Sequence, residues 1–121
     1  MLALVVDDSR AMRSILTRLL TNLGFDVAQA GDGAEALSVL NSGARPEVIL
    51  VDWNMPVLGG VEFLAELRGS LGGTKPKVVF CASENDVAHI ARAMRAGADD
   101  YILKPFDREI VEAKLQEVGL L

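Results

Sequence analysis

Five short apolar stretches recur along this chain, and each is followed by a stretch whose apolar residues lie three or four positions apart. The apolar stretches have the length of β-strands and cover residues 2–6, 25–30, 47–52, 77–82 and 100–103. The continuous run Leu2–Val6 is typical of a strand that is buried on both faces of a sheet.

The stretches between these strands are predicted to be helices. Ser9, Asp32 and Asp107 can cap three of them, and Gly24 and Gly97 end two. The spacing predicts helices over about residues 9–23, 32–41, 61–68, 86–96 and 107–118, with a loop at residues 69–75. The predicted inner face of the fourth helix consists of Val87, Ile90, Ala91 and Met94.

Five strand–helix repeats predict one α/β domain over residues 1–121. Strands that alternate with helices form a parallel sheet with right-handed crossovers and helices on both faces. In such sheets, ligands bind beyond the carboxyl ends of the strands. The polar residues at those ends are therefore the first candidates for function.

Composition and charge narrow the function classes. Half of the residues are apolar, which argues against disorder, and the net charge of −5 argues against direct binding of nucleic acid. No apolar run approaches the ~20 residues that span a bilayer, so we expect no membrane insertion. Cys81 is the only cysteine and lies in an apolar run, which favours a buried thiol in a cytoplasmic protein.

The carboxyl ends of the first, third and fifth predicted strands carry charged residues. Asp7 and Asp8 follow the first, Asp52 ends the third, and Lys104 follows the fifth. If the strands are parallel, these side chains meet at one edge of the sheet. Three carboxylates in one crevice repel each other, and Mg²⁺ relieves such repulsion because it prefers a few oxygen ligands.

The same residues suggest chemistry on a phosphoryl group. A carboxylate beside Mg²⁺ and a lysine is a competent nucleophile, because the two cations neutralise charge on the transferring oxygens. Asp52 is the better candidate, since the end of a central strand holds it in place. Asp7 and Asp8 follow their strand as a pair and can share a metal. Arg10, Arg13 and Arg18 are interpreted as a solvated helix face.

Three motifs lie in order on this pattern: the acidic pair Asp7-Asp8, VDWNMP at residues 51–56, and AGADDYILKPF at residues 96–106. Together they resemble the receiver domain of two-component response regulators, in particular the stand-alone chemotaxis (CheY-like) type. The resemblance covers the whole chain. It implies a flavodoxin-like (βα)₅ fold with a doubly wound parallel sheet and strand order 2-1-3-4-5.

The resemblance implies that Asp52 accepts a phosphoryl group from a histidine kinase. It also implies that Asp7, Asp8 (in part through water) and Asp52 bind Mg²⁺, with the backbone carbonyl of Asn54 as a further ligand. By the same comparison, the domain phosphorylates itself from a donor and slowly releases phosphate, and it is not otherwise an enzyme.

Further roles follow from the same resemblance. Lys104 would contact the phosphoryl group, and the Lys104–Pro105 peptide bond would be cis. Tyr101 matches the aromatic residue that moves inward on activation, and Asn54 and Glu84 match two positions that modulate dephosphorylation. The chain ends soon after the fifth helix, so we expect no output domain. The signal would then reach a target protein through the face of the fourth helix, fifth strand and fifth helix.

The sequence departs from the family pattern in two places. The position that usually carries a switch hydroxyl falls on Ala82, and Ser83 follows it. Either Ser83 substitutes as the phosphate contact through a shift of the strand end, or the switch is weakened. The second departure is Gly59-Gly60, where Asp-Gly is commoner.

Other readings of the sequence remain open. A phosphatase of the haloacid dehalogenase type would need the pattern D-x-D after the first strand, whereas Asp7 and Asp8 are adjacent. A nucleotide- or flavin-binding domain would need a phosphate-binding loop at that place. A receiver that binds its partner regardless of phosphorylation is favoured by Ala82.

Overall fold

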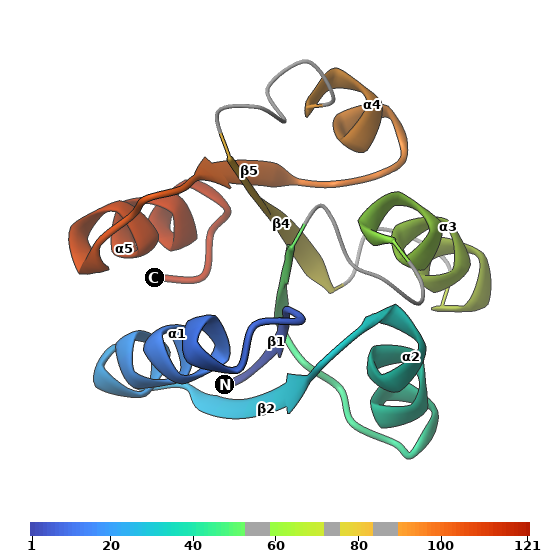
Figure 1. Ribbon diagram of the computed structural model, residues 1–121, viewed down its shortest axis with the longest axis horizontal. Coiled ribbons are helices and arrows are strands. Elements are labelled where there is room, and N and C mark those ends of the chain that lie inside the picture. The colour runs from blue at the N-terminus through green and yellow to red at the C-terminus, as the bar shows by residue number, and fades with distance from the viewer. Residues whose placement is uncertain (53–58, 72–75, 84–89) are drawn as a thin grey trace.

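In the computed structural model, residues 1–52, 59–71, 76–83 and 90–121 are described (Figure 1). Strands and helices alternate along the whole chain. The elements are β1 (Leu2–Val6), α1 (Arg10–Asn22), β2 (Asp26–Ala30), α2 (Gly33–Asn41), β3 (Val48–Asp52), α3 (Gly60–Leu71), β4 (Lys77–Ala82), α4 (Ile90–Arg95), β5 (Asp100–Leu103) and α5 (Arg108–Glu117).

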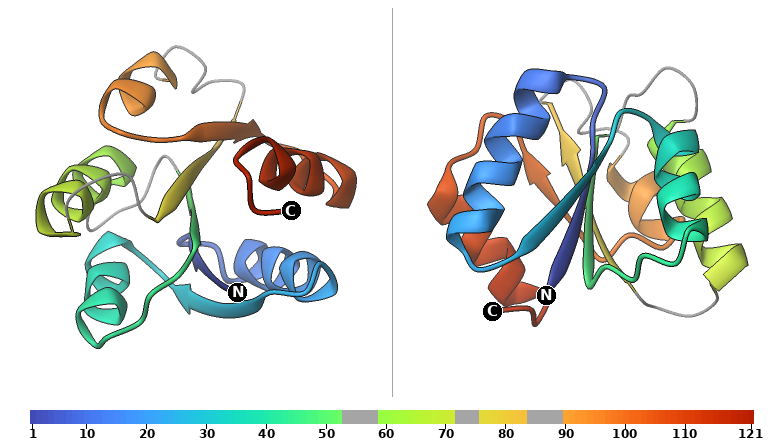
Figure 2. Two further views of the ribbon diagram at one scale, coloured as in Figure 1. Left: turned by 180° about the vertical axis from the view of Figure 1, so that it is seen from behind. Right: turned by 90° about the horizontal axis from the view of Figure 1, so that it is seen from below.

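All five strands belong to one parallel sheet in the order β2-β1-β3-β4-β5. The predicted fold class and strand order are therefore confirmed. Helices α1 and α5 cover one face of the sheet, and α2, α3 and α4 cover the other (Figures 1 and 2). No helix in the described part of the chain combines the length and apolar character that a membrane span requires.

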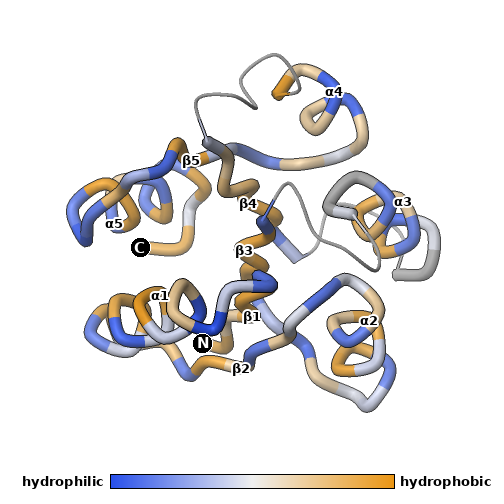
Figure 3. Tube along the Cα trace, in the orientation of Figure 1, coloured by the Kyte–Doolittle hydropathy of each residue, from blue (hydrophilic) through white to orange (hydrophobic). Residues whose placement is uncertain are grey.

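The apolar core consists of two clusters, one on each side of the sheet. Alternate residues of a strand point to opposite faces, so β1 sends Leu4 and Val6 to one cluster and Ala3 and Val5 to the other. We call them the α2–α3–α4 cluster and the α1–α5 cluster after the helices that complete them. The strands at the centre of the molecule are accordingly its most hydrophobic part (Figure 3).

The predicted helix caps are confirmed. The side chains of Ser9, Asp32 and Asp107 each accept a hydrogen bond from a backbone N–H three residues later, at 3.2, 2.8 and 2.9 Å. Gly24 and Gly97 follow α1 and α4 with φ of +96° and +116°, which a residue with a side chain rarely adopts.

Two local predictions are wrong. Helix α3 extends to Leu71, through the Gly69 and Ser70 that predict a loop. A glycine lowers helix stability by only ~1 kcal/mol, which the packing of the preceding turns offsets. On α4, Ala91 and Met94 are exposed and Ala93 is buried instead.

Arg68 of α3 ties three segments together at the edge of the sheet opposite to the strand carboxyl ends. Its guanidinium donates to the backbone carbonyls of Gly97 (2.9 and 3.2 Å) and Pro76 (2.8 Å), and to the carboxylate of Asp99 at 3.1 Å. The Asp99 carboxylate also accepts from the backbone N–H of Val78. These contacts join the C-terminal half of α3 to the start of β4 and to the turn that enters β5.

Candidate functional site

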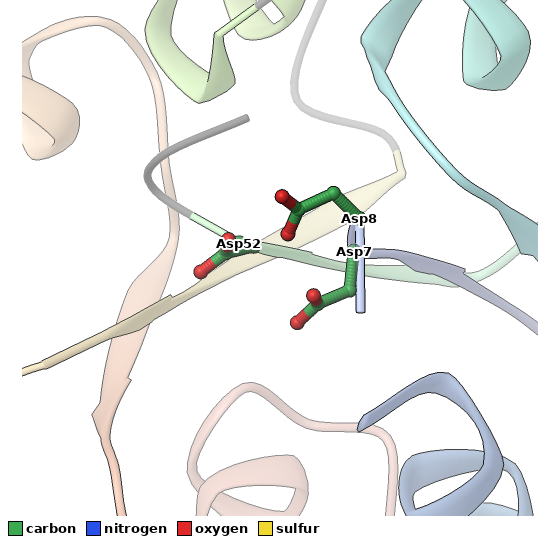
Figure 4. Close-up of side chains that lie close together, drawn as sticks. All are labelled: Asp7, Asp8 and Asp52. Atoms are coloured by element: carbon green, nitrogen blue, oxygen red, sulfur yellow. The ribbon is translucent and has the colours of Figure 1, made fainter. Parts of the chain in front are cut away.

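Strands β1 and β3 are neighbours, and their carboxyl ends bring three aspartates together. Val6 pairs with Val51, so Asp7, the next residue after β1, lies beside Asp52 at the end of β3. Asp7, Asp8 and Asp52 can each place one carboxylate oxygen within 4.8 Å of the others (Figure 4). The predicted convergence of these side chains is thus present.

Asp7 is held rigidly and is only 2% exposed. Its backbone N–H donates to Ala30 at 3.1 Å, and its Oδ1 accepts a hydrogen bond from the backbone N–H of Ser9 at 2.8 Å. Its Oδ2 is buried and has no hydrogen-bond partner. A buried carboxylate oxygen that accepts no hydrogen bond is costly, so this oxygen is a candidate ligand for a cation.

Lys104 reaches this group from the end of β5, the edge strand beyond β4. Its Nζ lies 2.9 Å from Oδ1 of Asp52 and 3.6 Å from Oδ2 of Asp7. The backbone N–H of Lys104 donates to the carbonyl of Ala82 at 2.7 Å, which fixes the start of the loop. The Lys104–Pro105 bond is cis, as the resemblance implies. The predicted meeting of lysine and carboxylates is confirmed.

The electrostatics of the site place Asp52 under opposing influences. Burial raises the pKa of Asp52, the hydrogen bond and charge of Lys104 lower it, and the charges of Asp7 and Asp8 raise it, with a net rise. Burial alone would lower the pKa of Lys104, but its hydrogen bond to Asp52 and the charges of Asp52 and Asp7 raise it overall. The raised pKa of Lys104 favours its cationic form, and this cation opposes the rise in the pKa of Asp52.

The donor set fits a hard divalent cation. Three carboxylates supply oxygen atoms only, one of these oxygens is buried without a hydrogen bond, and Asp8 is exposed, which leaves an open side. Mg²⁺ accepts such an arrangement because it keeps water in its remaining positions. Asn54, the further ligand that the resemblance implies, lies outside the described residues, as do Trp53 and Glu84.

At the end of β4, the position of the expected switch hydroxyl is apolar. Ala82 is buried, and the alternation along β4 places it on the same face as Phe80 and Tyr101. Ser83, the next residue, falls on the opposite parity. Whether Ser83 contacts the phosphoryl group therefore stays a prediction.

Tyr101 has a partner that the sequence did not suggest. The ring packs against the α2–α3–α4 cluster, and the ammonium of Lys114 from α5 lies 5.4 Å from its centroid. Lys114 also pairs with Asp100 and Glu117, each at 3.1 Å, and Asp100 accepts from the backbone N–H of Tyr101. Lys114, on α5, thus contacts a ring that packs against the α2–α3–α4 cluster on the other side of the sheet. Only its position one helical turn before the end of α5 could have indicated it.

The chain is similar to known chemotaxis proteins over nearly its whole length. Residues 3–116 match the family described as the response regulator receiver domain. A chemotaxis protein CheY homolog of Campylobacter jejuni is 36% identical over 116 residues, which are 95% of this chain and 89% of that protein. Chemotaxis protein CheY1 of Helicobacter pylori is 35% identical over 116 residues, 95% of this chain and 94% of that one.

The structural comparison agrees. The structure of chemotaxis protein CheY4 of Vibrio cholerae superimposes with a TM-score of 0.89 at 32% identity and covers 97% of both chains. The receiver domain of NtrX from Brucella abortus gives a TM-score of 0.86 at 28% identity and covers 98% of this chain and 97% of that one. The family match, the relatives and the fold agree, and this chain belongs to the response regulator receiver domains of two-component signalling.

Proposed function

We propose that Asp52 accepts a phosphoryl group from a phosphohistidine of a histidine kinase, and that the domain passes the signal on through a protein-binding face. The observation that carries this proposal is the hydrogen bond of 2.9 Å between Lys104 and Asp52 inside a group of three carboxylates. That arrangement supplies a nucleophile, a fixed cation and the oxygen ligands for a second cation at one point.

The transfer follows from this arrangement. A carboxylate oxygen of Asp52 attacks phosphorus, the P–O bond forms, and the P–N bond to the histidine breaks with its electron pair returning to the imidazole. Lys104 then loses its direct bond to the attacking oxygen and pairs with an oxygen of the phosphoryl group. Asp7 and Asp8, with Asp52, would hold Mg²⁺, which neutralises charge on the transferring oxygens when bound. Attack of water on phosphorus later breaks the P–O bond to Asp52, which restores the carboxylate and releases inorganic phosphate.

The output face is proposed to lie over α4, β5 and α5. Met94 and Leu103 are 38% and 39% exposed there, although both are apolar. Tyr101 and Lys114 lie on the same elements, between the phosphoacceptor end of the sheet and this surface. The relatives are chemotaxis proteins, so we propose that the target protein acts in a chemotaxis-like pathway and that the domain is cytoplasmic.

The test follows the fluorescence of Trp53, the only tryptophan of the chain and a neighbour of Asp52 in sequence. Mg²⁺ is titrated first, and beryllofluoride, a mimic of the phosphoryl group, is added second. A saturable response to each, with the second lost in Asp52→Asn, supports the proposal. No response to Mg²⁺ contradicts the metal site and with it the proposed chemistry.

Ala82 favours a second candidate function. A buried methyl group stands where the switch hydroxyl is expected, so phosphorylation has less means of drawing the neighbouring loop toward the site. The domain would then bind its partner equally with and without phosphate. A pull-down of partners by wild type with beryllofluoride, wild type alone and Asp52→Asn separates the two functions, because the constitutive module gives equal capture in all three.

A further inference from the structure

Arg13 of α1 departs from the solvated helix face that the sequence predicts. Its Nη1 donates a hydrogen bond of 2.7 Å to the backbone carbonyl of Asp7. Arg10 and Arg18 on the same helix are exposed, whereas Arg13 is partly buried. Among the described residues, Arg13 makes no ion pair with a carboxylate, and both of its hydrogen-bond partners are neutral oxygen atoms.

The guanidinium of Arg13 is itself held in place. Its Nε donates to Oε1 of Gln29 on β2 at 3.3 Å, and Nε2 of Gln29 donates to the hydroxyl of Thr17, one turn further along α1, at 3.0 Å. Gly31 lies beside the guanidinium, since a Cβ built at that position would be in van der Waals contact with Nη1 at 3.6 Å. A chain of hydrogen bonds therefore runs from Thr17 through Gln29 to Arg13, and only Arg13 contacts the backbone carbonyl of Asp7.

That carbonyl belongs to the peptide that joins Asp7 to Asp8. The same residue is fixed by its N–H to Ala30 and by its Oδ1 from Ser9. The bond from Arg13 completes the constraint on the peptide plane, and the plane sets the directions in which both carboxylates leave the chain. A charged donor bound to a carbonyl makes a stronger hydrogen bond than a neutral one does.

We propose that Arg13 is a positioning residue for the divalent cation site, which it preorganises by holding the Asp7–Asp8 peptide. This inference rests on the proposed function, since it concerns the same acidic site. Groups that hold metal ligands in place commonly contribute tenfold or more to metal affinity. Gln29 supports Arg13 in this role.

The charge of Arg13 and its positioning role have opposite effects on the affinity for Mg²⁺. A guanidinium near the site repels Mg²⁺, so removing a mere neighbouring charge strengthens binding. Removing a positioning residue weakens binding, because the two carboxylates must then be ordered when the cation arrives. The sign of the change distinguishes the two roles.

The experiment measures the Mg²⁺ dissociation constant by calorimetry in low salt. We expect Arg13→Met to bind Mg²⁺ about tenfold more weakly than wild type. The matched controls Arg10→Met and Arg18→Met remove the same charge from exposed positions of the same helix, and we expect them to bind as tightly as wild type or tighter. Arg13→Lys keeps the charge and one donor, so we expect it to recover part of the lost affinity.

A double-mutant cycle separates positioning from general destabilisation. Because Gln29 holds Arg13, Gln29→Met should weaken Mg²⁺ binding in wild type and change little in the Arg13→Met background. Urea unfolding in EDTA reports the stability of each variant without metal. A loss of stability without a loss of Mg²⁺ affinity overturns the proposal.

Equal Mg²⁺ affinity for Arg13→Met and Arg10→Met, with normal binding by wild type, overturns the role of Arg13 and leaves the proposed function intact. Failure of the wild-type protein to bind Mg²⁺ overturns the proposed site and the role of Arg13 together.

Discussion

Replacing Asp7 by asparagine is expected to stabilise the protein without metal and to abolish its stabilisation by Mg²⁺. The carboxylate is 2% exposed, and one of its oxygens is buried without a hydrogen bond. Asparagine keeps the shape and the acceptor for the N–H of Ser9. It removes the charge and places an amide donor where the unsatisfied oxygen was.

The magnitude follows from the distances. At an effective dielectric constant of about 20, two carboxylate oxygens within 4.8 Å of each other repel by about 3.5 kcal/mol or more, and the lysine 3.6 Å away attracts by about 4.6 kcal/mol. The attraction of Lys104 thus offsets the repulsion from Asp52. The repulsion from Asp8 adds little, because Asp8 is exposed and solvent screens its charge. What remains is the buried unsatisfied oxygen, which costs ~1–3 kcal/mol. We expect Asp7→Asn to gain about 1–2 kcal/mol in EDTA.

Urea unfolding in EDTA and in Mg²⁺ measures both effects. Wild type should gain about 2.7 kcal/mol when Mg²⁺ is present at a hundred times its dissociation constant. Asp7→Asn should gain almost nothing. The matched control is Asp26→Asn, an exposed aspartate at the start of β2, which should alter stability by less than ~0.5 kcal/mol. An Asp7→Asn protein that is less stable than wild type in EDTA, or that keeps the full Mg²⁺ effect, would refute the reasoning.

Three further predictions concern residues other than Asp7, Asp8 and Asp52. Burial raises the pKa of the Cys81 thiol to about 12. Because the thiol of the unfolded chain ionises near ~8.5, the free energy of unfolding should fall by up to ~1.4 kcal/mol per pH unit above that value. Urea unfolding of Cys81→Ala at the same pH values should lack this slope. Lys114→Met should cost about 1 kcal/mol, and a double-mutant cycle with Tyr101→Leu should show coupling, whereas additive losses would contradict the ring contact. Arg68→Met should lower the free energy of unfolding in urea by about 3 kcal/mol, because it leaves two carbonyls and a carboxylate with fewer partners. A loss below ~0.5 kcal/mol, typical of an exposed arginine, would show that these hydrogen bonds contribute nothing.

The sequence predicts the fold and the acidic site well because both depend on simple rules. Apolar runs separated by helical spacing lead to a parallel sheet, and a parallel sheet gathers its carboxyl ends at one edge. Asp7, Asp52 and Lys104 are each adjacent to a strand end, so their meeting follows without any knowledge of side-chain directions.

The parts that the sequence did not predict depend on directions of side chains and on small packing differences. Nothing in the spacing of α1 distinguishes Arg13 from its exposed neighbours, because the distinction arises from Gln29 on another element. On α4, the prediction is wrong for Ala91 and Met94 because spacing alone did not distinguish them from Ala93, which is buried; Val87 of the predicted face lies outside the described residues. Glycine at position 69 predicts a helix end that the packing of α3 overrides.

The division of the core into two clusters bears on how such chains diverge. The clusters share strands but no side chains, and each is completed by its own helices. Substitutions far apart and without common partners have additive effects on stability. Natural selection can therefore change core side chains of the α1–α5 cluster while the α2–α3–α4 cluster keeps its packing. The opposite is equally possible. The carboxyl edge of the sheet lacks this freedom, because residues from both sides meet there on the same few oxygen atoms.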